Sequence, residues 1–188
     1  TLYAHTPPRG TALDDAAEEG LVTSVWGSLG VLHRHQLSHG DLRRKEITVD
    51  AGTALFGGFG NSEYGASDEQ LQSDIAQLLV TTADKFGAEA TVRAAIDALG
   101  KDTVLTASRR LTKSALPARI GNAVSDPKAV MTAAREEVKR QTGADKIQAE
   151  TITRFTRKQV IQLVLLVALV YVAYPFISTV PTFFNELR

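Results

Sequence analysis

The 188-residue chain contains no cysteine, which excludes a disulfide framework, a cysteine-based metal site and thiol chemistry. Aromatic residues are scarce, at 6%, with a single tryptophan, but the 44% apolar content excludes a disordered polyampholyte. The net charge is zero because two unlike halves cancel: residues 1–100 carry −7 and residues 101–188 carry +7. That asymmetry indicates that one half faces an anionic surface. The chain opens at Thr1 and its one methionine is internal, so we expect a piece of a longer protein.

A long hydrophobic run lies near the end of the chain. Residues 160–177 contain one polar interruption, Gln162, and no charge. Because a helix needs roughly 20 apolar residues to cross ~30 Å of hydrocarbon, we expect a transmembrane helix over 158–184. A buried helix of a soluble core is the alternative, but soluble helices of this length usually carry a polar face.

Basic residues precede this run. Arg154, Arg157 and Lys158 are expected to lie at the membrane surface, and the positive-inside rule then puts the N-terminal part in the cytoplasm, at the plasma membrane. A second basic cluster comes earlier in the chain: Arg109, Arg110, Lys113 and Arg119. The spacing leaves open whether this second cluster contacts anionic lipid or forms an ordinary solvated helix face.

Local patterns predict the elements of the N-terminal part. Apolar residues at three- and four-residue spacings predict a helix over 13–37, with Thr11 as its N-cap. Two short β-like runs, 47–49 and 53–56, flank an Asp-Ala-Gly turn and predict a hairpin.

A strong helix is predicted at 68–86, where Ser67 and Gln70 have the spacing of a capping box and Gly87 ends the helix. Further helices are predicted at 88–99, at 102–113 and from Asp126-Pro127 to about Gln141, with Gly143 as the last C-cap.

Three motifs follow one another in the order found in kinases. His39-Gly40-Asp41-Leu42 is similar to a kinase catalytic loop, and Gly58-Phe59-Gly60 stands where kinases carry Asp-Phe-Gly, after the predicted hairpin. Asp74 matches the helical aspartate that braces the catalytic-loop backbone. Over residues 12–100 the chain therefore resembles the C-terminal lobe of the protein-kinase-like fold, in the form seen in bacterial small-molecule and aminoglycoside kinases.

A narrower resemblance covers the whole chain. The stretch 111–117 and the helix ending at 139–143 resemble the link of an actinobacterial family of multipass membrane proteins, in which a kinase-like region precedes a membrane domain similar to lysylphosphatidylglycerol synthase and flippase-like proteins. The resemblance implies as partners the lipid bilayer and the membrane domain of the same protein, and it leaves a further protein partner open.

The expected architecture is mostly α. A kinase-like C-lobe at 1–100, made of helices and a small β-hairpin, is followed by a basic juxtamembrane helical region at 101–157 and the transmembrane helix.

The departures from the kinase pattern bear on catalysis. In kinases the Asp of Asp-Phe-Gly and an Asn five residues after the catalytic Asp hold Mg²⁺. Here Gly58 offers no side chain, and Glu46 is the one substitute metal ligand. Asp41, the position that accepts the substrate hydroxyl proton, is present with His39. We therefore expect a non-catalytic regulatory or scaffolding module of a lipid-handling membrane protein, with no certain cofactor and with ATP bound, if at all, without Mg²⁺ or with weak Mg²⁺.

Two alternatives to this interpretation stay open: an atypical active small-molecule or lipid kinase that uses Glu46 as its metal ligand, and a purely structural domain that recruits a partner. Other chemistries are disfavoured. His33 and His35 lie two residues apart and would point to different sides of a helix, which disfavours a shared metal, and no Gly-x-Ser-x-Gly motif supports a serine hydrolase. Nucleic-acid binding is not expected, because the basic half lacks interleaved aromatic residues.

Overall fold

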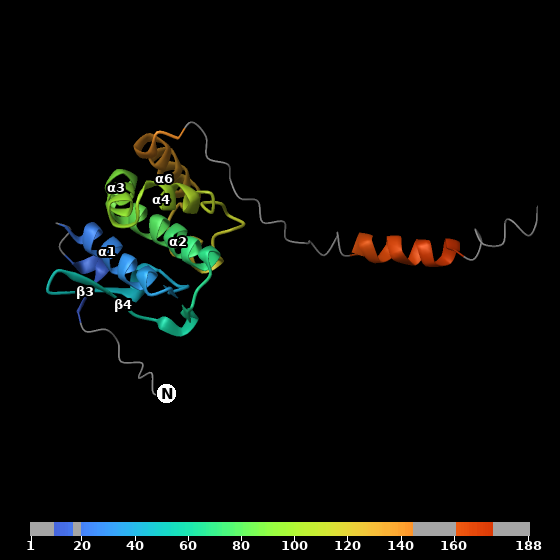
Figure 1. Ribbon diagram of the computed structural model, residues 1–188, viewed down its shortest axis with the longest axis horizontal. Helices are drawn as coiled ribbons and strands as arrows, with labels where there is room; N and C mark the ends of the chain where they lie inside the picture. Colours follow the sequence, from blue (N-terminus) through green and yellow to red (C-terminus); the bar gives the residue numbers. More distant parts are fainter. Residues whose placement is uncertain (1–9, 17–19, 145–160, 175–188) are drawn as a thin grey trace, which may run out of the picture. The chain divides into compact units, whose positions relative to one another are not determined.

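The computed structural model describes residues 10–16, 20–144 and 161–174, and it is mostly helical with small β-sheets (Figure 1). The chain divides into two compact units, Thr1–Thr151 and Ile152–Arg188, and each is described by itself. The first unit holds every motif of the kinase-like pattern.

The main sheet of the first unit is antiparallel. Strands β3 (Ile47–Asp50) and β4 (Thr53–Phe56) form the predicted hairpin, which the structure confirms. The backbone turns at Ala51 and Gly52, whose φ angles of 47° and 77° are the left-handed pair that a tight two-residue hairpin requires. A third strand, β1 (Thr11–Ala12), pairs with β3 and gives the order β1-β3-β4.

The first helix is shorter than its sequence pattern. α1 covers Leu21–Arg34, and the segment before it contains the 3₁₀ turn η1 (Leu13–Asp15). Thr11 as the N-cap is wrong, because its backbone pairs with Val49 of β3. Gly20, in a left-handed conformation, precedes the helix instead. A pairing partner 38 positions away overrides the local helical signal.

The outer edge of β4 is covered by α1. The Ser24 hydroxyl accepts a hydrogen bond from the Ala54 amide at 2.8 Å, and the Ser28 hydroxyl donates one to the Ala54 carbonyl at 2.6 Å. Residues four apart lie on the same face of a helix, so the two serines satisfy both backbone groups of one strand residue. Their role is structural.

The remaining helices follow the predicted punctuation. α2 covers Asp68–Phe86, and its Ser67–Gln70 capping box is confirmed, with both reciprocal hydrogen bonds present. α3 (Ala88–Leu99) ends at Gly100, as predicted. Three more helices are α4 (Lys101–Ser108), α5 (Ala118–Gly121) and α6 (Pro127–Thr142). Asp126 accepts from the Ala129 amide and Gly143 is left-handed, so both predicted ends of α6 are confirmed.

The helix predicted at 102–113 ends early, at Ser108. Beyond it the chain turns, and the Thr112 hydroxyl accepts a hydrogen bond from the Ala115 amide. A threonine side chain that bonds to a nearby amide gives the backbone an alternative to helix, which explains the early end.

The core lies around α2. Figure 1 shows α2 between α1, which lies beside the β3–β4 hairpin, and the group of α3, α4 and α6. Fully buried side chains come from each of these layers: Trp26, Ile47, Leu78, Leu79, Val92, Val104, Ala134 and Val138. Residues beyond 100 therefore pack into the same core as the motif-bearing segment, and α6 contacts both α2 and α3.

The transmembrane helix expected over 158–184 is wrong. Among the described residues no helix has the length and apolar character that crossing a bilayer requires. The described helix of the second unit covers 161–174. The other positions of that prediction lie outside the described residues.

The capping box gives a first testable prediction. Ser67→Ala removes the acceptor for the Gln70 amide and should lower the free energy of unfolding by about 1 kcal/mol. Urea denaturation measures the change, with Ser125→Ala as the control, because Ser125 is exposed and precedes α6 without capping it. Equal effects of the two variants would contradict the capping role.

Candidate functional site

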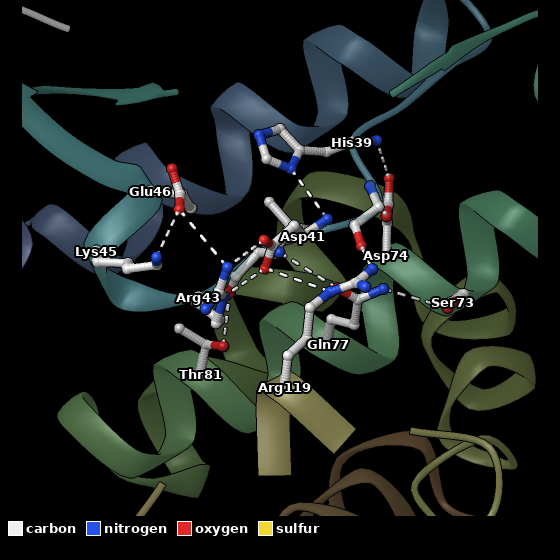
Figure 2. A network of polar contacts seen from close by, with 12 residues as sticks. His39, Asp41, Arg43, Lys45, Glu46, Ser73, Asp74, Gln77, Thr81 and Arg119 are labelled. Carbon is white, nitrogen blue, oxygen red and sulfur yellow. Dashed lines mark hydrogen bonds and ion pairs between the residues drawn. The ribbon is translucent and has the colours of Figure 1, made fainter. Parts of the chain in front are cut away.

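The His-Gly-Asp-Leu segment forms a buried loop between a short strand and a 3₁₀ turn. It follows β2 (Leu37–Ser38), which pairs with β5 (Glu63–Tyr64), and it precedes η2 (Arg44–Glu46). His39 is fully buried and Asp41 is 5% exposed. Figure 2 shows that the polar side chains around this loop come from the loop itself, from the following segment 43–46, from α2 and from Arg119 of α5. The structure thus brings most of the sequence-predicted site residues into one place.

One carboxylate of α2 holds the start of the loop. Asp74 is fully buried, and its Oδ2 and Oδ1 accept hydrogen bonds from the backbone amides of His39 at 2.6 Å and Gly40 at 2.8 Å (Figure 2). Charge-assisted bonds of this kind are roughly twice as strong as neutral ones. Asp74 therefore fixes the backbone ahead of Asp41.

Two further side chains of α2, which the sequence patterns did not single out, hold the end of the loop. Gln77 Oε1 accepts from the Leu42 amide at 3.2 Å, and the Thr81 hydroxyl donates to the Leu42 carbonyl at 2.7 Å. Both side chains are buried. Their positions, three and seven residues after Asp74, put them on its helix face, and that run of polar residues within an apolar helix is the signal that would have found them.

The His39 ring ties the loop to the Gly-Phe-Gly segment. Its Nε2 lies 2.6 Å from the Gly57 carbonyl, and its Nδ1 accepts from the Asp41 amide at 3.2 Å. The ring also contacts Phe56 and Phe59, with centroids 5.7 and 4.7 Å away. Both ring nitrogens of His39 therefore contact backbone atoms, and the side chain has a structural role.

The Asp41 carboxylate is held by arginine. Arg43 donates from Nε to Oδ1 at 2.7 Å and from Nη2 to Oδ2 at 2.5 Å, a two-point fork, and Arg119 Nε lies 3.6 Å from Oδ1 (Figure 2). Burial by itself raises the pKa of Asp41, but the hydrogen bonds and charge of Arg43, with the charge of Arg119, outweigh it and lower that pKa below 3.8.

Glu46 is engaged by neighbouring cations. Its Oε1 lies 3.5 Å from Lys45 Nζ and 3.8 Å from Arg43 Nη2. The same Arg43 nitrogen bonds Asp41, so one guanidinium bridges both carboxylates. Gly58 lies against this group: its φ is +68°, and a Cβ built there would come 2.6 Å from Glu46 Cδ. Glu46 thus occupies the space that a side chain at position 58 would need.

These residues do not fit the magnesium ion that the kinase resemblance implies. A divalent cation needs several free oxygen ligands, and here the two nearest carboxylates face Arg43. Across 10–16, 20–144 and 161–174, no three His, Cys, Asp or Glu side chains are grouped to hold a metal ion. No step is therefore derived through a metal.

Gly40 is required by a close approach. Its φ is +78°, and a Cβ at this position would lie 2.6 Å from the Asn61 carbonyl oxygen of η3 (Phe59–Asn61). The two segments that carry the kinase-like motifs therefore touch through backbone, and this contact has no room for a side chain.

The two basic clusters of the sequence have different outcomes. Arg154, Arg157 and Lys158, the residues predicted at the membrane surface, lie outside the described residues. In the second basic cluster, Arg119 donates to the Gly40 carbonyl and lies beside Asp41, whereas Arg109 and Lys113 are exposed. Arg119 thus belongs to the site, although 79 positions separate it from Gly40.

The Arg43–Asp41 pair predicts a titration. Because the folded-state pKa of Asp41 is lowered, the pair contributes stability at pH values above 3.8, and that stability is lost as the pH falls through the folded value. Arg43→Met should raise the pKa of Asp41, since burial is then less opposed. Carbon-13 NMR titration of the carboxyl group measures it. Arg44→Met is the control, because Arg44 pairs with Asp14 and Asp84. An unchanged pKa in Arg43→Met would contradict the fork.

Comparisons with known proteins add no relative. No family model, no curated protein and no solved structure matches this chain. The function proposed below is therefore inferred from the geometry of the site.

Proposed function

We propose that this chain is a non-catalytic regulatory or scaffolding module built on a kinase-like C-terminal lobe. The observation that carries the proposal is the two-point fork of Arg43 on Asp41, with bonds of 2.7 and 2.5 Å. The residue that stands in the place of a catalytic base is bound in an internal ion pair.

A general base needs a free acceptor and a pKa near the working pH. Asp41 has neither property, because both its oxygens accept from Arg43 and its pKa is lowered. Phosphoryl transfer further depends on metal ions that neutralise developing charge on the phosphates. The Arg43 guanidinium instead lies between Asp41 and Glu46, where those acids would otherwise attract a cation.

The hydrogen bonds that hold this loop favour a regulatory role for it over a vestigial one. Asp74, Gln77 and Thr81 hold four backbone groups of the loop; three of the four bonds are buried and the fourth, at Gly40, is partly buried. Buried polar networks that are fully satisfied specify one conformation. The loop is therefore a rigid element that a partner or ligand can read without any chemistry.

The sequence resemblance and the charge pattern support a connection to a lipid-handling membrane protein, at the cytoplasmic side of the plasma membrane. The alternative is an active kinase that uses Glu46 as its metal ligand. The following measurement distinguishes this alternative from our proposal.

Manganese binding tests the proposal. Mn²⁺ is titrated with the chain in the presence of ATP and followed by electron paramagnetic resonance. We expect no Mn²⁺ bound to the chain at Mn²⁺ concentrations below about 1 mM, which corresponds to a weak affinity. Glu46→Gln should leave the spectrum unchanged, because Glu46 pairs with Lys45 and Arg43. One Mn²⁺ per chain, held in the wild type and lost in Glu46→Gln, would favour the active kinase and overturn the proposal.

A further inference from the structure

A groove lies away from the Asp41 site and is lined by residues of helices α1, α2, α3 and α4. It has a volume of about 580 Å³, within the ~300–1,000 Å³ range of small-molecule sites. Its apolar lining includes the side chains of Leu71, Ile75 and Leu99.

Four polar side chains that line the groove are uncommitted. Arg34, Asp68, Asp102 and Thr103 line it, and in the described part of the chain none of these four side chains makes a hydrogen bond or an ion pair. Asp68 and Asp102 lie in the first turns of α2 and α4, where their charge also offsets the helix dipole. Both carboxylates, and the one guanidinium, are still free to bind a ligand.

The wall of the groove also contains a buried imidazole. The His33 side chain is 10% exposed, and its Nε2 is buried without a hydrogen-bond partner. That nitrogen lies 3.5 Å from Asp74 Oδ2, the oxygen that accepts from the His39 amide. His33 therefore lies between the groove and Asp74, the residue that holds the loop at 39–42.

We propose that this groove binds a small zwitterion of the amino-acid class and that occupancy is transmitted through His33 and Asp74 to the loop at 39–42. The Asp68 and Asp102 carboxylates suit an ammonium group, Arg34 suits an acid group, and the apolar lining suits an aliphatic side chain. A ligand that contacts His33 holds its ring against Asp74. This regulatory half rests on the proposed function, whereas the binding half does not.

Titration calorimetry of the whole chain tests the binding with three probes of one skeleton. L-Leucine should bind with a Kd of about 1 mM or tighter, whereas 4-methylpentanoate, which lacks the amine, and 3-methylbutylamine, which lacks the acid, should each bind at least about tenfold more weakly. Equal affinity of the three probes, or no binding of L-leucine at about 10 mM, would overturn the proposal.

Matched variants locate the site. Asp102→Asn and Arg34→Gln should each weaken L-leucine at least about fivefold, and Thr103→Trp, at an exposed position, should abolish binding by filling the groove. The controls Asp97→Asn and Arg109→Gln, exposed and outside the groove, should not change the affinity. Binding that survives Thr103→Trp would place the ligand elsewhere and contradict the proposal.

Amide hydrogen exchange tests the coupling. Saturating L-leucine should slow exchange of the His39 and Gly40 amides by about threefold or more and leave the Gly143 amide, bonded to Lys139, unchanged. Binding without this change would refute the transmission through His33. Because ATP turnover and metal binding are measured separately, a failure here is distinct from a failure of the proposed function.

Discussion

Asp74→Ala is expected to lower the free energy of unfolding by about 3–5 kcal/mol. The variant leaves the buried amide of His39 and the partly buried amide of Gly40 without an acceptor, and each hydrogen bond to a charged group contributes about 1.5–3 kcal/mol. Urea denaturation followed by circular dichroism measures the loss. The expected effect is large because a single carboxylate satisfies two backbone donors.

Two companion variants interpret that result. Asp74→Asn keeps one acceptor and should cost less than Asp74→Ala, and Asp97→Ala, at an exposed position of α3, should stay within about 0.5 kcal/mol of the wild type. A loss below about 1 kcal/mol for Asp74→Ala would mean that the loop is not held by α2.

Gly40→Ala is expected to destabilise the chain by about 2–5 kcal/mol. The left-handed backbone costs an L-residue about 1–2 kcal/mol, and the added methyl overlaps the Asn61 carbonyl, which adds about 1–3 kcal/mol of overpacking. The measurement is again the free energy of unfolding in urea.

Gly52→Ala is the matched control for Gly40→Ala. Gly52 has a φ of +77°, one degree from that of Gly40, but a Cβ added to it would have no neighbour within 4 Å. Its replacement therefore carries only the backbone cost. Equal losses in the two variants would show that the approach of Asn61 to Gly40 is not tight.

Local signals explain what the sequence predicted well. The Ala51-Gly52 turn, the Ser67 capping box and the Gly143 C-cap each depend on residues within a few positions of one another, and all three are confirmed. The early end of α4 is also local, but the bond of the Thr112 hydroxyl to a nearby amide competes with helix in a way that apolar spacing does not record.

Contacts distant in sequence explain what was missed. Thr11 was expected to cap a helix and instead pairs with Val49. Arg119 belonged to a basic cluster whose role the spacing left open, and the structure shows it in contact with Gly40 and Asp41. A charge count cannot tell which of several arginines reaches a carboxylate 78 positions away.

The sequence predicted which residues form the candidate site, but it did not predict that Asp41 would be paired with Arg43. The order of His39, Asp41, Gly58 and Asp74 marked the segment, yet nothing in the sequence showed that Arg43, two residues after Asp41, would turn back on it. Both oxygens of Asp41 are committed through that contact. The absence of a free base at this position thus depends on one side-chain conformation.

The most direct measurement is the release of ADP from ATP with Mg²⁺, in this chain and in any longer natural protein that includes it. We predict the same rate for the wild type and for Asp41→Asn, and both rates should equal the rate without protein. The reason is that an Asp41 bound to Arg43 takes no proton from a substrate hydroxyl. A wild-type rate that Asp41→Asn reduces by about a hundredfold or more would contradict it, and would identify Asp41 as a working base.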